Sequence, residues 1–174
     1  ALAVAPNLAR YWFTTAREVE QGAAAVPDRI ALIDDTGVLT YRQLRDDSRG
    51  LAKWLLSLKE ERDLDGLRIG VMARNGRGII LPLAAKGYAG ADIFLLNIGS
   101  SPEQLARIFA ENDINVLFID DEFADRLPDT AGITVVRAHE DGGRGLALAE
   151  VARRDVDRQL PRWPKHGNLV LMSS

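Results

Sequence analysis

The sequence predicts an α/β fold in which helices flank a mostly parallel sheet. Short apolar runs of strand length alternate with segments whose apolar residues recur at helical spacing. From Leu67 to Asn97 the order is strand, turn, helix and strand within about 30 residues, the size of one right-handed βαβ unit. We therefore expect residues 1–174 to form a single α/β domain.

The composition is that of a globular protein. Hydrophobic residues make up 47% of the chain and charged residues 27%. The net charge is −3 and no basic stripe is interleaved with aromatic residues, so no nucleic-acid partner is expected. The absence of cysteine excludes disulfides, thiolate metal sites and thiol catalysis, and suits a cytoplasmic protein. No apolar run reaches ~18 residues, so no transmembrane segment is expected, although peripheral membrane association stays open.

The chain is expected to begin with a helix from Asn7 to Ala25, which Pro27 ends because the residue before a proline avoids the helical region. Two strand-like runs, Ile30–Ile33 and Val38–Thr40, then flank the turn residues Asp34–Gly37. This order predicts a small β-hairpin near the N-terminus.

The next helix has a clear start. Thr40 is a suitable N-cap, and Gln43 lies three residues on, as in a capping box. The charged run from Lys59 to Asp65 predicts a solvated loop after this helix.

The βαβ unit contains one residue that conflicts with a helix. Strands are expected at Arg68–Met72 and Ile93–Leu96, with the crossover helix between them. Pro82 falls inside that helix, where a proline costs ~3 kcal/mol. The helix is therefore expected either to begin late, near Ile79 to Leu81, or to kink at the proline.

The second half continues the alternation of helices and strands. Ser101 followed by Pro102 and Gln104 is a strong helix start. The remaining expected elements are strands at Val116–Ile119, Ile133–Val136 and Asn168–Met172, a short helix at Leu146–Val151, and a surface connector from Arg153 to Lys165.

A glycine-containing turn in the βαβ unit, Gly76-Arg-Gly78, lies where dinucleotide-binding proteins bind pyrophosphate. Their fingerprint requires a third glycine and an acidic residue at the end of the second strand. Here Leu81 replaces the third glycine, and Leu95–Asn97 carries no acid. Turn glycines in a crossover are the better interpretation, which leaves a nicotinamide-dependent Rossmann protein as an unsupported rival.

Few residues are candidates for chemistry. His139 and His166 are the two histidines and have no cysteine or paired acidic motif beside them, so no metal site is expected. The acidic run Asp120–Glu122 follows a strand, where cations sometimes bind, but an exposed turn is the commoner case. Ser173 and Ser174 follow an apolar strand, the position at which phosphate-binding loops begin.

Five segments carry a pattern in a fixed order. They are Pro27–Ile33, Leu39–Leu44, Arg68–Met72 followed by Asn75, Gly90–Ala91 with Leu95–Asn97, and Leu169–Ser174. Together they resemble the N-terminal portion of the adenylate-forming superfamily: acyl-CoA synthetases, adenylation domains and luciferases. The Leu95-Leu-Asn97 form looks most like that of fatty-acid–CoA ligases.

The resemblance implies a two-step reaction. A carboxylic acid, here a fatty acid, attacks the α-phosphate of ATP with Mg²⁺ to give acyl-AMP and pyrophosphate. The thiol of CoA, or of a carrier protein, then displaces AMP. Ser173 and Ser174 correspond to the residues that lead into the family's glycine-rich phosphate loop, S-[SG]-G-[ST]-[TS]-G-x-P-K.

The family's other functional motifs have no counterpart in these 174 residues. We therefore expect an N-terminal fragment of an acyl-activating ligase, with no catalytic residue of its own and no activity in isolation. Tyr88 stands near a position where some relatives carry a basic residue that contacts CoA. Lys86 is an alternative for that contact, although a surface lysine is the simpler interpretation. The rival hypothesis is a non-catalytic α/β binding or regulatory module.

Overall fold

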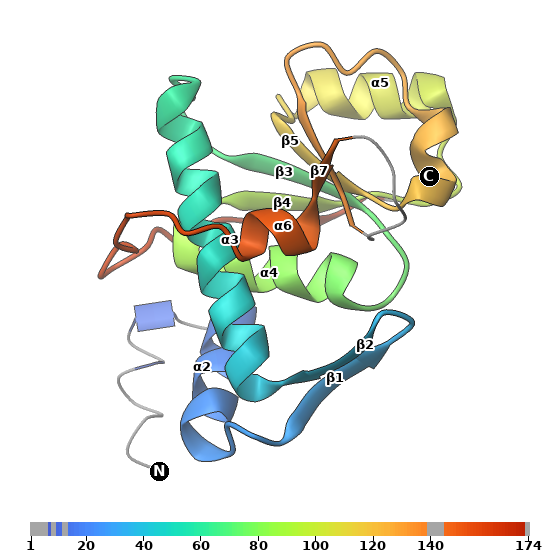
Figure 1. Cartoon of the computed structure of the whole chain (residues 1–174). Coiled ribbons are helices and arrows are strands. Elements are labelled where there is room, and N and C mark those ends of the chain that lie inside the picture. The colour runs from blue at the N-terminus through green and yellow to red at the C-terminus, as the bar shows by residue number, and fades with distance from the viewer. Residues whose placement is uncertain (1–6, 8–9, 12–13, 139–144, 173–174) are drawn as a thin grey trace.

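The computed structural model describes residues 7, 10–11, 14–138 and 145–172. Its centre is a six-stranded sheet with the order β7-β6-β5-β3-β4-β8, in which every neighbouring pair is parallel (Figure 1). The predicted parallel sheet is therefore confirmed. Its strands are β3 (Arg68–Met72), β4 (Asp92–Leu95), β5 (Val116–Ile119), β6 (Thr134–Arg137), β7 (Leu146–Ala147) and β8 (Leu169–Leu171).

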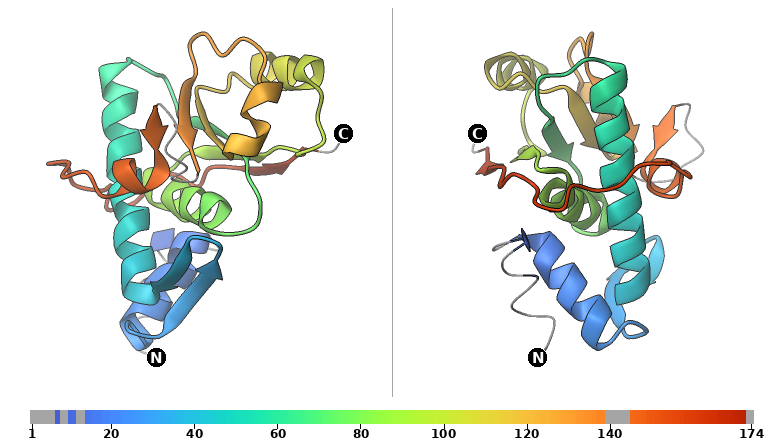
Figure 2. Two further views of the ribbon diagram at one scale, coloured as in Figure 1. Left: turned by 45° about the vertical axis from the view of Figure 1, so that its right-hand side comes forward. Right: turned by 90° about the vertical axis from the view of Figure 1, so that its left-hand side faces the viewer.

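Helices cover both faces of the sheet (Figure 2). On one face lie α3 (Tyr41–Glu61), α4 (Arg77–Ala89) and α6 (Leu148–Ala152), and α2 (Thr15–Ala25) packs against α3 and α4. The other packs against α5 (Pro102–Glu111) and the 3₁₀ helix η1 (Asp121–Arg126). The described residues include no helix with the length and hydropathy needed to cross a membrane.

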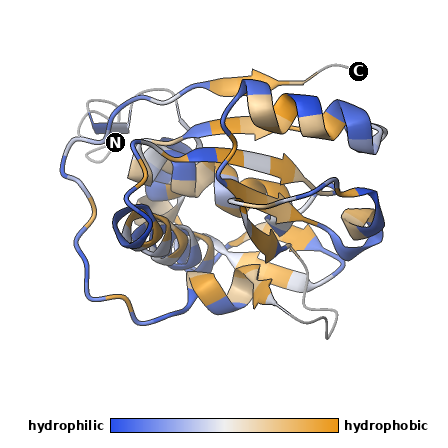
Figure 3. Cartoon of the chain, turned by 90° about the horizontal axis from the view of Figure 1, so that it is seen from above, coloured by the Kyte–Doolittle hydropathy of each residue, from blue (hydrophilic) through white to orange (hydrophobic). Residues whose placement is uncertain are grey.

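Alternate residues of each strand enter opposite core clusters. In β5, Val116 and Phe118 pack with the α3 and α4 side, whereas Leu117 and Ile119 pack with α5. All four of these side chains are at most 1% exposed. Burial on both faces explains the continuous apolar runs in the sequence (Figure 3), as expected for parallel strands.

The predicted hairpin is present as β1 (Ile30–Asp34) and β2 (Gly37–Thr40), which pair antiparallel. Both predicted capping boxes also form. The backbone N–H of Thr40 donates to Gln43 Oε1 at 2.9 Å, and that of Ser101 donates to Gln104 Oε1 at 2.8 Å. These short motifs fix where α3 and α5 begin, because they satisfy N–H groups that the helix itself leaves unbonded.

Several predicted boundaries are wrong. A continuous helix from Asn7 is interrupted at Thr14, whose backbone is extended. Helix α3 runs three residues into the expected charged loop and ends at Glu61. The crossover helix begins at Arg77, so Pro82 lies inside it and the late start does not occur.

The expected helix from Leu146 begins instead with the short strand β7, and α6 follows at Leu148. Pairing with β6 accounts for this, since Val136 lies opposite Leu146 and Arg137 opposite Ala147. A contact between strands far apart in the chain thus overrides the local helical pattern.

Candidate functional site

The C-terminal edge of the sheet is the candidate site. The chain leaves β3 for β4 through α4 on one face, and leaves β5 for β6 through η1 on the other face. The neighbouring ends of β3 and β5 therefore form a topological switch point, the place where open α/β sheets bind ligands.

The acidic residues after β5 lie at this switch point. Asp120 is 2% exposed, and its Oδ2 accepts a hydrogen bond from the backbone N–H of Arg74 at 2.7 Å. The Arg74 guanidinium binds both carboxylate oxygens of Glu122, at 2.5 and 2.8 Å. The interpretation as an exposed acidic turn is thus wrong for Asp120, whose carboxylate is buried and ties the loop after β3 to the end of β5.

The loop after β3 is also anchored to the hairpin. Asp34, at the end of β1, accepts a hydrogen bond from the backbone N–H of Arg77 at 2.9 Å, so it caps α4 from a distant part of the chain. The same carboxylate binds the Arg77 guanidinium, with Nη2 to Oδ1 at 2.8 Å. The side chain of Arg77 is 10% exposed, and that of Asp34 is 6% exposed.

Electrostatics favour the charged form of this pair. Burial opposes ionisation of Asp34, but the hydrogen bonds and the charge of Arg77 outweigh it. The pKa of Asp34 is therefore lower than its ordinary value. The pair is an ionised anchor between the hairpin and the first turn of α4.

The two turn glycines face protein atoms. A Cβ on Gly76 would lie 3.0 Å from Asp34 Oδ2, and the backbone φ of Gly76 is +145°. A Cβ on Gly78 would lie 3.0 Å from that of Ala138 and 3.2 Å from that of Ala73. These glycines allow a tight approach of loop, hairpin and sheet, which agrees with their interpretation as crossover glycines.

Strand β8 reaches the same edge of the sheet. It runs parallel to β4, and the backbone N–H of Met172 donates to the carbonyl of Leu95 at 3.0 Å. Met172 thus lies beside the end of β4. Ser173 and Ser174, the predicted lead-in to a phosphate loop, lie outside the described residues, as does His139.

Two polar side chains clamp the segment before β8. Lys86, on α4, donates from Nζ to the carbonyl of Gly167 at 2.5 Å. Asp92, at the start of β4, accepts from the backbone N–H of Asn168 at 2.6 Å. Gly167 also packs tightly, since a Cβ there would lie 1.8 Å from the carbonyl oxygen of Ala91. These contacts fix where β8 begins against β4.

The interpretation of Lys86 as a surface lysine is wrong. The residue is 8% exposed, and burial lowers its pKa. Its ammonium is already used in the clamp, which leaves the alternative role in CoA contact without support.

Tyr88 is equally enclosed. It is 1% exposed, and its hydroxyl donates to Glu20 Oε1 at 2.6 Å. Its ring meets that of Tyr11 edge-on at 5.1 Å. Burial, reinforced by Glu20, raises its pKa. This part of α4 is therefore covered by α2 and residue 11.

The sequence analysis predicted neither the Asp34–Arg77 ion pair nor the Lys86–Gly167 hydrogen bond. Asp34 and Arg77 are 43 positions apart, and Lys86 and Gly167 are 81 apart. No motif joins such residues, because each has an ordinary local role as a turn or helix residue. The two glycines at the contacts, Gly76 and Gly167, are the sole local signal.

Comparisons with known proteins agree with this architecture. The family model described as "AMP-binding enzyme" matches residues 19–172. A medium/long-chain-fatty-acid–CoA/3-oxocholest-4-en-26-oate–CoA ligase from Mycobacterium tuberculosis H37Rv is 32% identical over 127 residues. That match covers 71% of this chain but 23% of the relative, so the chain spans about a quarter of the length of such proteins.

Solved structures show the same fold. The anthranilate CoA ligase AuaEII, in complex with anthranoyl-AMP, superposes with a TM-score of 0.70 at 15% identity, over 87% of this chain and 30% of that one. A benzoate CoA ligase from Burkholderia xenovorans LB400 gives 0.64 at 18% identity, over 80% and 28%. At these identities the likeness concerns the fold.

Proposed function

The chain belongs to the AMP-binding enzyme family, and we propose that it is the N-terminal part of an ATP-dependent fatty-acid–CoA ligase. The observation that carries the proposal is the family match over residues 19–172, almost the whole described chain. The curated relatives, named as fatty-acid and steroid-acid CoA ligases, support the acid–thiol class. We propose that residues 1–174 act as one α/β domain of that enzyme.

In the proposed reaction the carboxylate oxygen of the acid bonds to the α-phosphorus of ATP, and pyrophosphate leaves. The sulfur of CoA, or of a carrier protein, then bonds to the acyl carbon, and AMP leaves with the electron pair of the broken C–O bond. Backbone amides and cations stabilise the negative charge that develops on phosphate oxygens in such reactions.

This chain's own residues would frame the ATP site. Arg74 and Asp120 hold the loop after β3 against the end of β5, and the Lys86 and Asp92 clamp fixes the start of β8. Ser173 and Ser174 would begin the phosphate loop. Magnesium would enter with ATP; no group of three His, Asp or Glu side chains within the described residues is placed to hold it.

Reading the gene beyond codon 174 is the first test. We expect a glycine-rich sequence of the form G-[ST]-T-G-x-P-K directly after Ser174. The complete gene product should release pyrophosphate from ATP when a fatty acid is added, and the 174 residues alone should not. A stop codon after Ser174, or pyrophosphate release by the isolated chain, would contradict the proposal, and the stop codon would favour a non-catalytic module.

We also propose a cytoplasmic location, which the absence of cysteine supports. Cell fractionation tests it. Recovery of the gene product with membranes, and its release by salt, would indicate peripheral association instead.

A further inference from the structure

The apolar pattern of β8 does not by itself fix the register of this strand against β4. The four residues from Leu169 to Met172 are all apolar. Val170 and Met172 pack in the core on the α5 side, whereas Leu169 and Leu171 alternate with them and are 53% and 74% exposed. A shift by one residue would exchange two apolar pairs, so burial distinguishes the two registers weakly.

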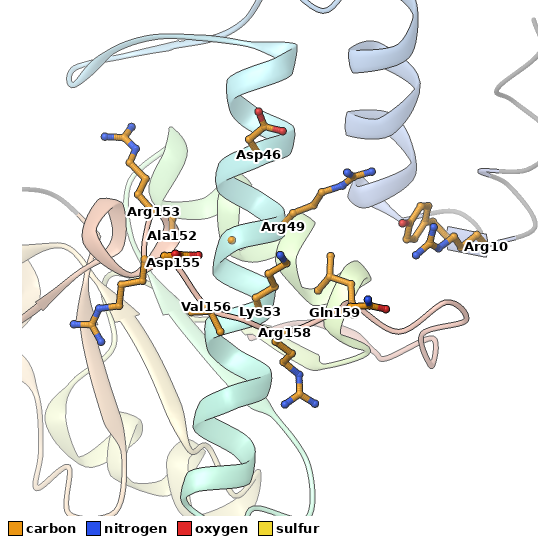
Figure 4. Close-up of a pocket in the computed structure, with 14 residues that line it drawn as sticks. Arg10, Asp46, Arg49, Lys53, Ala152, Arg153, Asp155, Val156, Arg158 and Gln159 are labelled. Atoms are coloured by element: carbon orange, nitrogen blue, oxygen red, sulfur yellow. The ribbon is translucent and has the colours of Figure 1, made fainter.

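The connector that leads to β8 leaves the register open as well. The segment 152–160 crosses α3, and a pocket of about 540 Å³ remains between them (Figure 4). Val156 and Leu160 pack on the core, and Arg158 pairs with Glu60, a side chain that is 67% exposed. The chain then runs on for several residues before β8 begins, so these contacts permit a shift by one residue.

One peptide group just before β8 is held at both ends by charges of opposite sign. The carbonyl of Gly167 accepts a hydrogen bond from Lys86 Nζ at 2.5 Å, and the N–H of Asn168 donates to Asp92 Oδ1 at 2.6 Å. The C=O and N–H of a trans peptide point in opposite directions, so the ammonium and the carboxylate approach it from opposite sides. Together they fix the position and the rotation of this peptide.

Packing selects the same peptide. The two charged groups of the clamp belong to the short segment 86–92, which ends α4 and begins β4. Within that segment, the carbonyl oxygen of Ala91 would lie 1.8 Å from a Cβ on Gly167. A shift by one residue would bring His166 or Asn168 to this place, and each of them carries a Cβ. The contact therefore accepts a glycine and opposes both neighbouring registers.

The register of β8 decides where the chain after Met172 is delivered. A one-residue shift moves a strand by about 3.3 Å and turns every side chain to the other face. Misplacing a reacting group by ~1 Å can lower a rate ~100-fold.

We propose that Lys86 and Asp92 are positioning residues of the ligase reaction: by clamping the Gly167–Asn168 peptide they set the register of β8, and so place the phosphate loop for ATP. The catalytic part of this inference rests on the proposed function, in which Ser173 begins that loop. The register itself can be measured without any activity.

The first test measures the two half-reactions of the complete gene product. Lys86→Met and Asp92→Val remove the charged groups, and each should lower pyrophosphate release at saturating substrates by about tenfold or more. The KM for the fatty acid should stay within about twofold, since that site is not moved. Thioester formation from added acyl-AMP and CoA releases no pyrophosphate and should fall by less than about threefold.

Two further variants serve as controls for this kinetic test. Asp92→Asn keeps an acceptor oxygen on the same side chain and should recover most of the rate that Asp92→Val loses. Lys165→Met removes an exposed lysine of the connector and should change neither half-reaction.

The second test measures the register directly. Leu95 and Leu171 are partners across β4 and β8, and the 174 residues contain no cysteine. In the complete gene product, Leu95→Cys with Leu171→Cys should form a disulfide on oxidation, whereas Leu95→Cys with Val170→Cys or Met172→Cys should not. Adding Lys86→Met or Asp92→Val should weaken the first disulfide and allow one of the others, as mass spectrometry of the linked peptides would show.

The two tests separate a failure of this proposal from a failure of the proposed function. If the natural protein releases no pyrophosphate, the ligase function and the catalytic part of the proposal are both wrong, and the disulfides alone decide the register. If the natural protein is active, unchanged rates in both variants would overturn the proposal. Slower release with the natural disulfide pattern, or equal losses in Asp92→Asn and Asp92→Val, would overturn it as well.

Discussion

The central strand β3 and the edge strand β8 both end at the candidate site, the C-terminal edge of the sheet, but different interactions hold them there. After Arg68, every residue of β3 is buried, between neighbours on both sides. In β8, Leu169 and Leu171 are 53% and 74% exposed, and among the strands that the structure describes only β4 pairs with it. Burial therefore positions the centre of the sheet, whereas polar clamps position the strand that leads to Ser173.

The largest expected effect concerns the central strand. Ile69→Ala should lower the free energy of unfolding by about 2–5 kcal/mol, because it removes buried methyl groups and leaves a cavity. Ile69 is 0% exposed. Urea unfolding measures the change, and Ile98→Ala, at a residue 39% exposed, is the control. If both variants lose the same small amount of unfolding free energy, the burial of β3 contributes no more to stability than an exposed residue does.

The buried ion pair between the end of β1 and the first turn of α4, Asp34 with Arg77, should come next. Asp34→Asn should cost about 3 kcal/mol at neutral pH, because it leaves the Arg77 guanidinium without its countercharge. Urea unfolding at pH 7 measures this loss. Asp35→Asn, on the adjacent exposed residue, should cost little.

The same pair predicts a pH dependence. Since folding lowers the pKa of Asp34, its contribution is present above the unfolded pKa of about 3.9 and is lost as the pH falls through the folded value. The stability difference between the natural protein and Asp34→Asn should therefore shrink in acid. A difference that stays constant down to pH 2 would show that Asp34 is not ionised in the folded state.

The smallest expected effect concerns the clamp on β8. Lys86→Met should lower global stability by about 1–2 kcal/mol, since a charged hydrogen bond is lost while the desolvation of the ammonium is relieved. Its local effect should be larger: limited proteolysis should cut the segment 153–168 faster than in the natural protein. Lys165→Met, at an exposed lysine of that segment, is the matched control. If proteolysis of the Lys86→Met variant is unchanged, the Lys86 hydrogen bond does not hold β8 in place.

Local patterns predicted the frame of the molecule. The alternation of apolar runs gave the parallel sheet, Thr40 and Ser101 gave the starts of α3 and α5, and five ordered segments gave the family. These signals can be read from sequence because a capping box or an amphipathic face depends on residues within one or two helical turns.

The predictions that were wrong concern residues whose structure depends on partners elsewhere in the chain. Strand β7 forms because β6 lies beside it, and Asp120 is buried because the loop after β3 folds over it. A segment whose local pattern predicts a helix or an exposed turn can instead form a strand or be buried when it packs against such a partner.

What the sequence determined by itself is the α/β class, the order of the elements and the family. The tertiary structure alone decided which groups meet: the side chains of Asp34 and Arg77, and the Lys86 ammonium with the carbonyl of Gly167. The reason is physical. Periodicity and capping act over a few residues, whereas these contacts join residues that only the packing of helices on the sheet brings together.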